Sequence, residues 1–195
     1  DANIEDLKIP YTAIAADIIN KEEVAFTKGS IYEAIRASIS IPTVFTPVKI
    51  NGGLLVDGGV LNNIPVNHAK RIKGDILIVV NVNANTPVDK PLIPELERIE
   101  KQSIYENKIK YFYNRLKKVS PLSKADNIGY FDLISKTINL MTYHTSQLML
   151  QHYKPDILIN ISRESCGIYD FFKAEELVEI GRHAAIKSLA GNPLK

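Results

Sequence analysis

The chain lacks the residues on which several common kinds of site depend. It has one cysteine, Cys166, and no tryptophan among its 195 residues. A single cysteine cannot form an internal disulfide, which is consistent with a reducing compartment. Neither a Cys-x-x-Cys pair nor a His-Glu-x-x-His motif occurs, so we expect no metal and no cofactor. No apolar run approaches the roughly 18 residues of a membrane-spanning helix, which predicts a protein of the cytoplasm or of a membrane surface.

An excess of charge of one sign is also absent. The net charge is +2, and 24% of the residues are charged while 45% are hydrophobic, which is ordinary for a globular domain. This composition gives no reason to expect a nucleic-acid partner. The length suits one domain, and no linker, repeat or low-complexity segment divides residues 1–195.

Strand and helix patterns alternate along most of the chain. Apolar runs predict strands at 9–16, 24–27, 47–50, 54–56, 75–83 and 156–161. Helices are predicted from Ser30, from near Pro65 to Gly74, and over 95–118, 130–153 and 174–189. Ser30 precedes Glu33 by three residues, as in a capping box, and Pro42 should end that helix. The alternation predicts an α/β fold with a mainly parallel sheet and helices on both faces.

Two of these segments carry more specific predictions. The sequence Asn51-Gly52-Gly53 separates two short strand patterns and is a strong signal for a β-hairpin turn. Residues 76–82 form a near-continuous apolar run, which is typical of a central strand buried on both faces of a sheet.

Asp57 is the first candidate for a functional side chain. It follows a short apolar strand and precedes Gly58 and Gly59, which allow close approach of the backbone. Ligands of open α/β sheets bind outside the carboxyl ends of strands, where an aspartate can accept a proton. Aspartate and glycine also dominate ordinary turns. The residues alone therefore leave both a turn and a catalytic carboxylate open.

Two sequence blocks resemble the patatin-like phospholipase family. They are AIRASISIP at 34–42 and VDGGVLNNIPV at 56–66, in the family's order and at its usual separation. The resemblance covers nearly the whole chain, although 84–127 is only loosely matched. It implies that Asp57 pairs with a serine in a catalytic dyad, with Gly58 and Gly59 shaping the turn. Asn63 should cap a helix or brace the loop, and Asp57 should lie at the bottom or rim of a cleft.

The family's other motif is missing. In that family the serine lies in a Gly-x-Ser-x-Gly elbow, and none of the ten glycines here belongs to one. Gly29-Ser30 comes closest, but no glycine closes the motif. The resemblance therefore implies that residues 1–195 are the C-terminal part of a single patatin-like domain truncated at its N-terminus. The missing part should leave an apolar edge or face that the full-length chain covers.

The implied function is that of a lipid acyl hydrolase, a phospholipase or esterase, whose substrate is a lipid or another acyl ester. This chain would supply the aspartate and would be inactive without the N-terminal half. Two alternatives remain: a non-catalytic remnant that binds lipid or protein, and a regulatory partner, each docking onto a separate N-terminal half. His68 is the rival base, but its neighbours predict a histidine on the surface of the helix that starts near Pro65.

Two helices bear on a lipid partner. The helix over 95–118 mixes lysines and aromatic residues with glutamates, which favours a solvated face over a membrane-binding one. Among functional interpretations, a peripheral contact with a lipid surface fits the family best. The helix over 130–153 is apolar enough to form core, and in a lipase it could line an acyl pocket.

Overall fold

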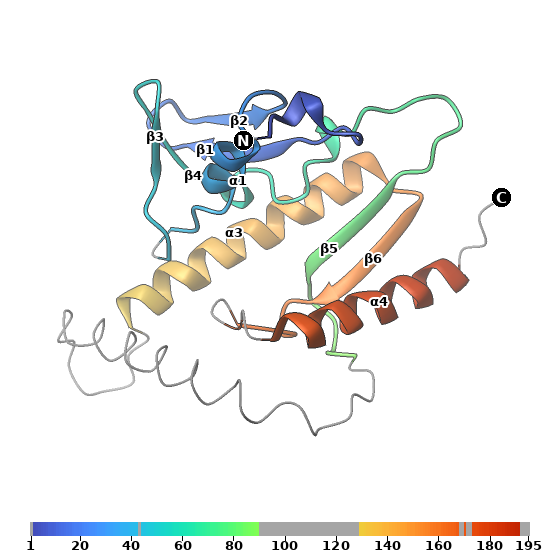
Figure 1. The fold of residues 1–195 in the computed structure, drawn as a ribbon. Coiled ribbons are helices and arrows are strands. Elements are labelled where there is room, and N and C mark those ends of the chain that lie inside the picture. Colours follow the sequence, from blue (N-terminus) through green and yellow to red (C-terminus); the bar gives the residue numbers. More distant parts are fainter. Residues whose placement is uncertain (1, 43, 90–128, 168–169, 171–172, 192–195) are drawn as a thin grey trace. The chain divides into compact units, whose positions relative to one another are not determined.

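The computed structural model describes residues 2–42, 44–89, 129–167, 170 and 173–191 (Figure 1). The chain divides into two compact units, the first made of residues 1–75 and 130–154 and the second of residues 76–129 and 155–195. The helix predicted over 95–118 and the loop predicted over 120–127 lie outside the described residues.

The first unit is built on a four-stranded sheet. Its strands run in the order β2 (Glu22–Phe26), β1 (Ala13–Asp17), β4 (Gly53–Asp57) and β3 (Val48–Ile50), and each neighbouring pair is antiparallel. The predicted hairpin is confirmed, with β3 and β4 joined by Asn51 and Gly52 at φ values of 49° and 83°. Positive φ at both turn positions gives the twist that a two-residue hairpin requires.

The prediction of a mainly parallel sheet is wrong. The α/β character is present, but the four-stranded sheet is entirely antiparallel and only the two strands of the second unit are parallel. The connections explain the difference, because β1 and β2 are joined by a short turn and β3 and β4 by two residues. Parallel neighbours need a crossover of a dozen or more residues.

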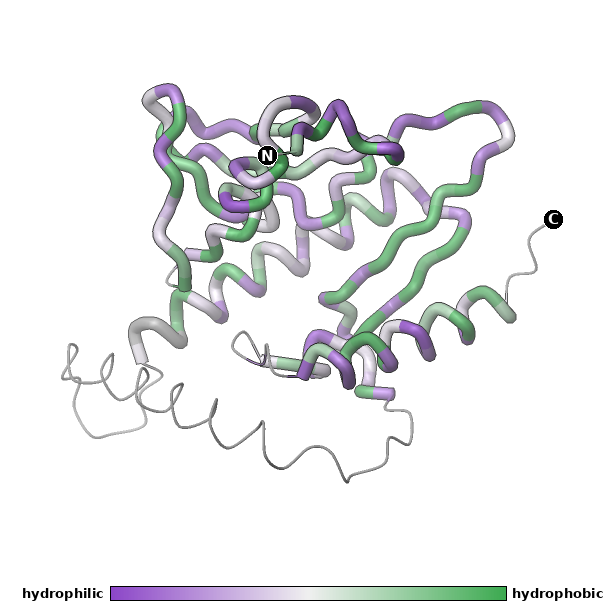
Figure 2. The backbone as a smooth tube through the Cα atoms, in the orientation of Figure 1, coloured by the Kyte–Doolittle hydropathy of each residue, from purple (hydrophilic) through white to green (hydrophobic). Residues whose placement is uncertain are grey.

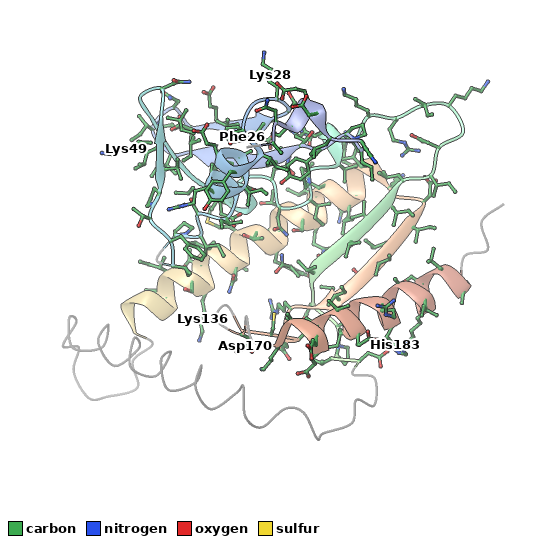
Figure 3. The ribbon with its side chains drawn as sticks, in the orientation of Figure 1. Phe26, Lys28, Lys49, Lys136, Asp170 and His183 are labelled. Atoms are coloured by element: carbon green, nitrogen blue, oxygen red, sulfur yellow. The ribbon has the colours of Figure 1, made fainter. Side chains whose placement is uncertain are left out.

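One face of the sheet packs against α1 (Ile31–Ser38). Its Ala34 packs with Ala13, and its Ala37 packs with Ala15 and Leu55. Phe26 of β2, labelled in Figure 3, packs against both groups. Alanines at these contacts allow the helix backbone to approach the sheet closely. The predicted helix start is confirmed, since Ser30 Oγ accepts the Glu33 N–H at 3.4 Å, and the helix ends before Pro42.

The segment that follows Asp57 runs through two short 3₁₀ turns, η2 (Gly58–Val60) and η3 (Val66–His68), and both contact α3 (Tyr130–Tyr153). A third such turn, η1 (Ile4–Asp6), lies near the N-terminus. The helix predicted from near Pro65 to Gly74 is wrong. Ala69 already has extended backbone, with φ −71° and ψ 113°. Side chains of this segment bond to Glu23 of β2, and the backbone does not continue as a helix. The helix predicted over 130–153 is confirmed as α3.

The second unit contains the parallel strands β5 (Ile78–Ala84) and β6 (Ile157–Ser162) and the helix α4 (Ala174–Gly191), which packs on β6. The hydrophobic character of both strands is evident in Figure 2. The strand predicted at 76–82 is confirmed, but its burial on both faces is wrong. Ile78, Val80 and Val82 are 50%, 51% and 55% exposed. Alternate residues of β5 are covered, as in a strand with one protected face.

Candidate functional site

Asp57 is the last residue of β4 and is held by two backbone hydrogen bonds. Its N–H donates to the carbonyl oxygen of Ser40 at 3.0 Å, and its carboxylate Oδ1 accepts the N–H of Gly59 at 2.7 Å. Within the described residues, Oδ2 has no hydrogen-bond partner. One carboxylate oxygen is therefore fixed while the other is free to accept a proton.

The surroundings of Asp57 change its acidity. Burial raises the pKa of this half-buried carboxyl, and the hydrogen bond from Gly59 opposes that rise without cancelling it. Desolvation disfavours the charged form of a carboxylate. A raised pKa makes the ionised carboxylate a stronger base, which is the direction a general base requires.

Close packing excludes a side chain at Gly58 and leaves little space for one at Gly59. A Cβ on Gly58 would lie 2.4 Å from the carbonyl oxygen of Ile14, so no side chain fits there. A Cβ on Gly59 would lie 3.0 Å from Asp57 Oδ1 and 3.1 Å from Asn63 Oδ1. Gly59 thus occupies the narrow space between the carboxylate and the Asn63 carboxamide.

Asn63 and Gly59 are both fastened to α3. Asn63 Nδ2 donates to Ser146 Oγ at 3.1 Å, and Thr142 Oγ1 donates to the Gly59 carbonyl at 3.2 Å. Ser146 is 1% exposed. Asn63 caps no helix, because the helix predicted to follow it is absent, and it links the Asp57 loop to α3 instead.

On the other side, Ser40 supports the backbone of Asp57. Ser40 is fully buried, and its Oγ accepts Arg36 Nη1 at 2.7 Å and donates to the Arg36 carbonyl at 2.8 Å. Arg36 Nη2 also donates to the carbonyl of Thr46 at 2.8 Å. The segment that follows α1 and the C-terminal end of β4 are therefore fixed to each other at Ser40, which accepts the Asp57 N–H.

His68, the rival base, is engaged elsewhere. It is half-buried in a 3₁₀ turn and not exposed on an α-helix, and its Nε2 pairs with the carboxylate of Glu23 on β2. Burial raises the pKa of Glu23, but hydrogen bonds from His68 and Asn62 outweigh it and hold that pKa below its ordinary value. Asn62 Nδ2 donates to Glu23 Oε2 at 2.6 Å and to Asn67 Oδ1 at 2.8 Å. This polar cluster ties the segment after Asp57 to β2.

Comparison with known proteins finds similarity to one family. Residues 2–70, which include the Asp57 loop, match the family model described as patatin-like phospholipase. The chain is 26% identical over 231 residues to an uncharacterized NTE family protein of Mycobacterium tuberculosis, a match covering 95% of this chain and 64% of that protein. These matches support a relationship to the patatin-like phospholipase family.

Two further relatives are eukaryotic. The chain is 29% identical over 186 residues to lysophospholipase NTE1 of Candida albicans, covering 92% of this chain and 12% of that protein. It is 35% identical over 91 residues to patatin-like phospholipase domain-containing protein 7 of Mus musculus, covering 46% of this chain and 7% of that protein. The chain thus spans less than two thirds of the length of each of these relatives.

The remaining histidines, His144, His152 and His183, lie on helices. His144 and His152 of α3 each make an edge contact with the neighbouring tyrosine ring. His183 of α4, labelled in Figure 3, has Nε2 3.6 Å from Asp89 Oδ2. The part of the chain that the structure describes contains no group of three or more histidine, cysteine, aspartate or glutamate side chains placed to hold a metal ion. Of its helices, none has the length and apolarity that crossing a membrane would need.

A cavity of about 470 Å³ lies in the second unit. Its lining comes from the segment after β5, from β6 and from α4, and includes Asp89, Ser165 and Lys187 but not Asp57. That Asp57 lines a cleft stays a prediction.

The sequence does not single out several residues of the site. Ser40 lies within the AIRASISIP block, so its position beside Asp57 could have been suspected. Glu23, Thr142 and Ser146 carried no such signal. The contacts of Thr142 and Ser146 with the loop each join residues 83 positions apart.

Proposed function

We propose that this chain supplies the general base of a lipid acyl hydrolase that works through a serine–aspartate dyad. Asp57 is the base, and the serine lies in a part of the protein outside these 195 residues. Residues 1–195 are, in this proposal, the C-terminal part of a single patatin-like domain. Gly58, Gly59 and Asn63 shape and brace the loop that presents the carboxylate.

The observation that carries the proposal is the state of the Asp57 carboxylate. One oxygen is fixed by the Gly59 N–H at 2.7 Å, while burial raises the pKa of the group. Were Asp57 only a turn residue, the Gly59 bond would account for it, and partial burial of the charge would be an uncompensated cost. A base that must receive a proton accounts for the free, partly desolvated Oδ2.

The chemistry follows from this geometry. A serine hydroxyl is a weak nucleophile until a base within hydrogen-bond reach takes its proton. Asp57 Oδ2 accepts that proton as the serine Oγ attacks the ester carbonyl carbon. The proton then passes to the departing alcohol, leaving an acyl-enzyme. Asp57 next deprotonates a water that attacks the acyl carbonyl carbon. Asp57 then returns this proton to the serine Oγ as the acyl–oxygen bond breaks and the fatty acid leaves.

The names of the relatives indicate the substrate class. One relative is a lysophospholipase and another is a patatin-like phospholipase domain-containing protein. We propose a glycerophospholipid or lysophospholipid ester as substrate, which implies a peripheral contact with a lipid surface.

The exposed apolar stripe on β5, formed by Ile78, Val80 and Val82, fits a surface that another part of the same domain covers.

The test is ester hydrolysis by the full-length protein. Wild type should hydrolyse short p-nitrophenyl esters and lysophospholipids, and Asp57→Asn should lower kcat by roughly 10²- to 10⁴-fold without lowering the unfolding temperature. Asparagine keeps the size of the side chain but cannot take the serine proton. Asp89→Asn, which removes the same charge from an exposed residue of the second unit, is the matched control and should retain wild-type activity.

Two outcomes would contradict the proposal. One is full activity in Asp57→Asn. The other is ester hydrolysis by residues 1–195 alone, because this segment has no Gly-x-Ser-x-Gly serine. Binding of lipid vesicles by a full-length protein that hydrolyses no ester would favour the non-catalytic alternative. A folded His68→Ala variant that loses all activity would favour a histidine base.

A further inference from the structure

Four groups on the loop and on α3 form a closed circuit beside Asp57. Asn63 Nδ2 donates to Ser146 Oγ at 3.1 Å, and Ser146 Oγ donates to the Thr142 carbonyl at 2.8 Å. Thr142 Oγ1 then donates to the Gly59 carbonyl at 3.2 Å. Both ends of the circuit lie on the loop, and the Asn63 carboxamide oxygen lies 3.1 Å from the position that a Cβ on Gly59 would take.

The circuit acts on the residue that fixes the Asp57 carboxylate. Gly59 is held from two directions: its N–H donates to Asp57 Oδ1 at 2.7 Å, and its carbonyl accepts from Thr142. Glycine has the widest conformational freedom of any residue, so without a second anchor its N–H would not keep one direction. The hydroxyl of Thr142 supplies that anchor, and Ser146 holds the neighbouring turn through Asn63.

We propose that Thr142 and Ser146 of α3 are positioning residues for the catalytic carboxylate. They touch neither Asp57 nor the substrate, and they act by holding Gly59 and Asn63 so that Asp57 Oδ2 faces the serine. This inference rests on the proposed function of Asp57. It assigns a role in catalysis to a helix that follows the loop by more than 60 residues and that neither sequence block contains.

The burial of Ser146 supports a role in fixing the position of Gly59 beside the Asp57 carboxylate. Ser146 is 1% exposed, and Thr142 is half-buried. A helix is a rigid support compared with the loop it contacts. Because reacting atoms misplaced by about 1 Å can cost 10²-fold in rate, a small movement of Gly59 should appear in catalysis before it appears in folding.

The experiment compares hydroxyl-deleting and hydroxyl-keeping variants of the full-length protein on a p-nitrophenyl ester. Thr142→Val and Ser146→Ala should lower kcat by roughly 10- to 100-fold with little change in KM. Thr142→Ser, which keeps the hydroxyl, should restore most of kcat. Thr137→Val is the matched control: its hydroxyl also bonds a carbonyl of α3, that of Leu133, but it is exposed and away from the loop.

A second measurement separates positioning from general stability. Without its anchor, the Gly59 N–H should bond Asp57 less well, which raises the pKa of the carboxyl further. The acid limb of the kcat/KM profile should therefore move to higher pH in Thr142→Val and return in Thr142→Ser. Unfolding temperatures measured in parallel identify any variant that has lost its fold. If Thr142→Val does not fold, Ser146→Ala serves in its place.

The outcomes distinguish this inference from the proposed function. If Asp57→Asn is inactive while Thr142→Val and Ser146→Ala match wild type, the positioning role is wrong and the dyad stands. If kcat and the unfolding temperature fall together, with no shift of the acid limb and no rescue by Thr142→Ser, the circuit is only structural. If Asp57→Asn is active, the dyad itself is wrong.

Discussion

The Asp57 loop and strand β5 differ in what holds each of them in place. The loop is short and irregular, yet its polar groups bond to the segment after α1, to α3 and to β2, through Ser40, Thr142, Ser146 and Glu23. Strand β5 has regular structure and a strongly apolar sequence, yet alternate side chains along it are about half exposed. Regularity and hydrophobicity are thus poor guides to which part of this molecule is fixed. The network of bonds around the loop is the better guide.

The largest expected effect comes from adding a methyl group to the loop. Gly58→Ala would place a Cβ 2.4 Å from the Ile14 carbonyl oxygen, so backbone must move, at a cost of about 3 kcal/mol or more. Gly181→Ala in α4 is the matched control, because its Cβ would meet only Ile161 Cδ1 at 3.9 Å. It should stabilise the helix by about 0.5–1 kcal/mol. Urea unfolding of both variants measures the difference in unfolding free energy. Similar urea midpoints for the two variants would contradict the tighter packing of the Asp57 loop.

Substituting one buried and one exposed strand residue tests the contrast in packing. Leu55 of β4 is 2% exposed and Val80 of β5 is 51% exposed. Leu55→Ala should cost about 2–5 kcal/mol of unfolding free energy, whereas Val80→Thr should change it by about 0.5 kcal/mol or less. In the full-length protein, a large cost for Val80→Thr would show that another segment covers β5. Equal losses of unfolding free energy for the two variants of residues 1–195 alone would show that β4 and β5 do not differ in packing.

The Glu23–His68 pair predicts a pH-dependent contribution to stability. Hydrogen bonds in the folded state hold the pKa of Glu23 below its ordinary value of 4.5. The pair therefore stabilises the fold above that value, and the contribution is lost as pH falls through the lower folded-state pKa. Glu23→Gln should lower the unfolding temperature by a few degrees at neutral pH and have no effect in strong acid. Glu22→Gln, on the exposed face of the same strand, should match wild type at every pH.

The smallest expected effect is at the surface of the second unit. Lys187 Nζ lies 2.9 Å from Asp89 Oδ2, but both side chains are largely exposed. Exposed pairs of this kind contribute little because water and salt screen them. Asp89→Asn should leave the unfolding temperature within experimental error of wild type. A clear loss of stability in a thermal melt would show that the second unit depends on its surface charges more than its geometry indicates.

Some elements were predictable because their determinants are local. Residues 130–153 were predicted as a helix, and α3 has those bounds, since an apolar face repeating every three to four residues is a property of one segment. The Asn51-Gly52 turn and the Ser30 cap were predictable for the same reason. Asp57 was found through the DGG motif, and its catalytic role stays a prediction.

Other features depended on which segments meet. The near-continuous apolar run of β5 indicated burial on both faces, but coverage depends on partners that the run does not encode. The segment after Pro65 had helical spacing, yet Glu23 lies on a distant strand where it can pair with His68, and that pairing favours a 3₁₀ turn over a helix.

The sequence alone determined the family blocks, the candidate aspartate and the glycines that must follow it, because these follow from the order of neighbouring residues. The tertiary structure alone decided that the sheet around Asp57 is antiparallel, that His68 pairs with Glu23, and that Thr142 and Ser146 of α3 hold Gly59 and Asn63. A hydrogen bond across 83 residues exists only once two separate elements have packed together. No local pattern of residue types specifies where such a bond will form.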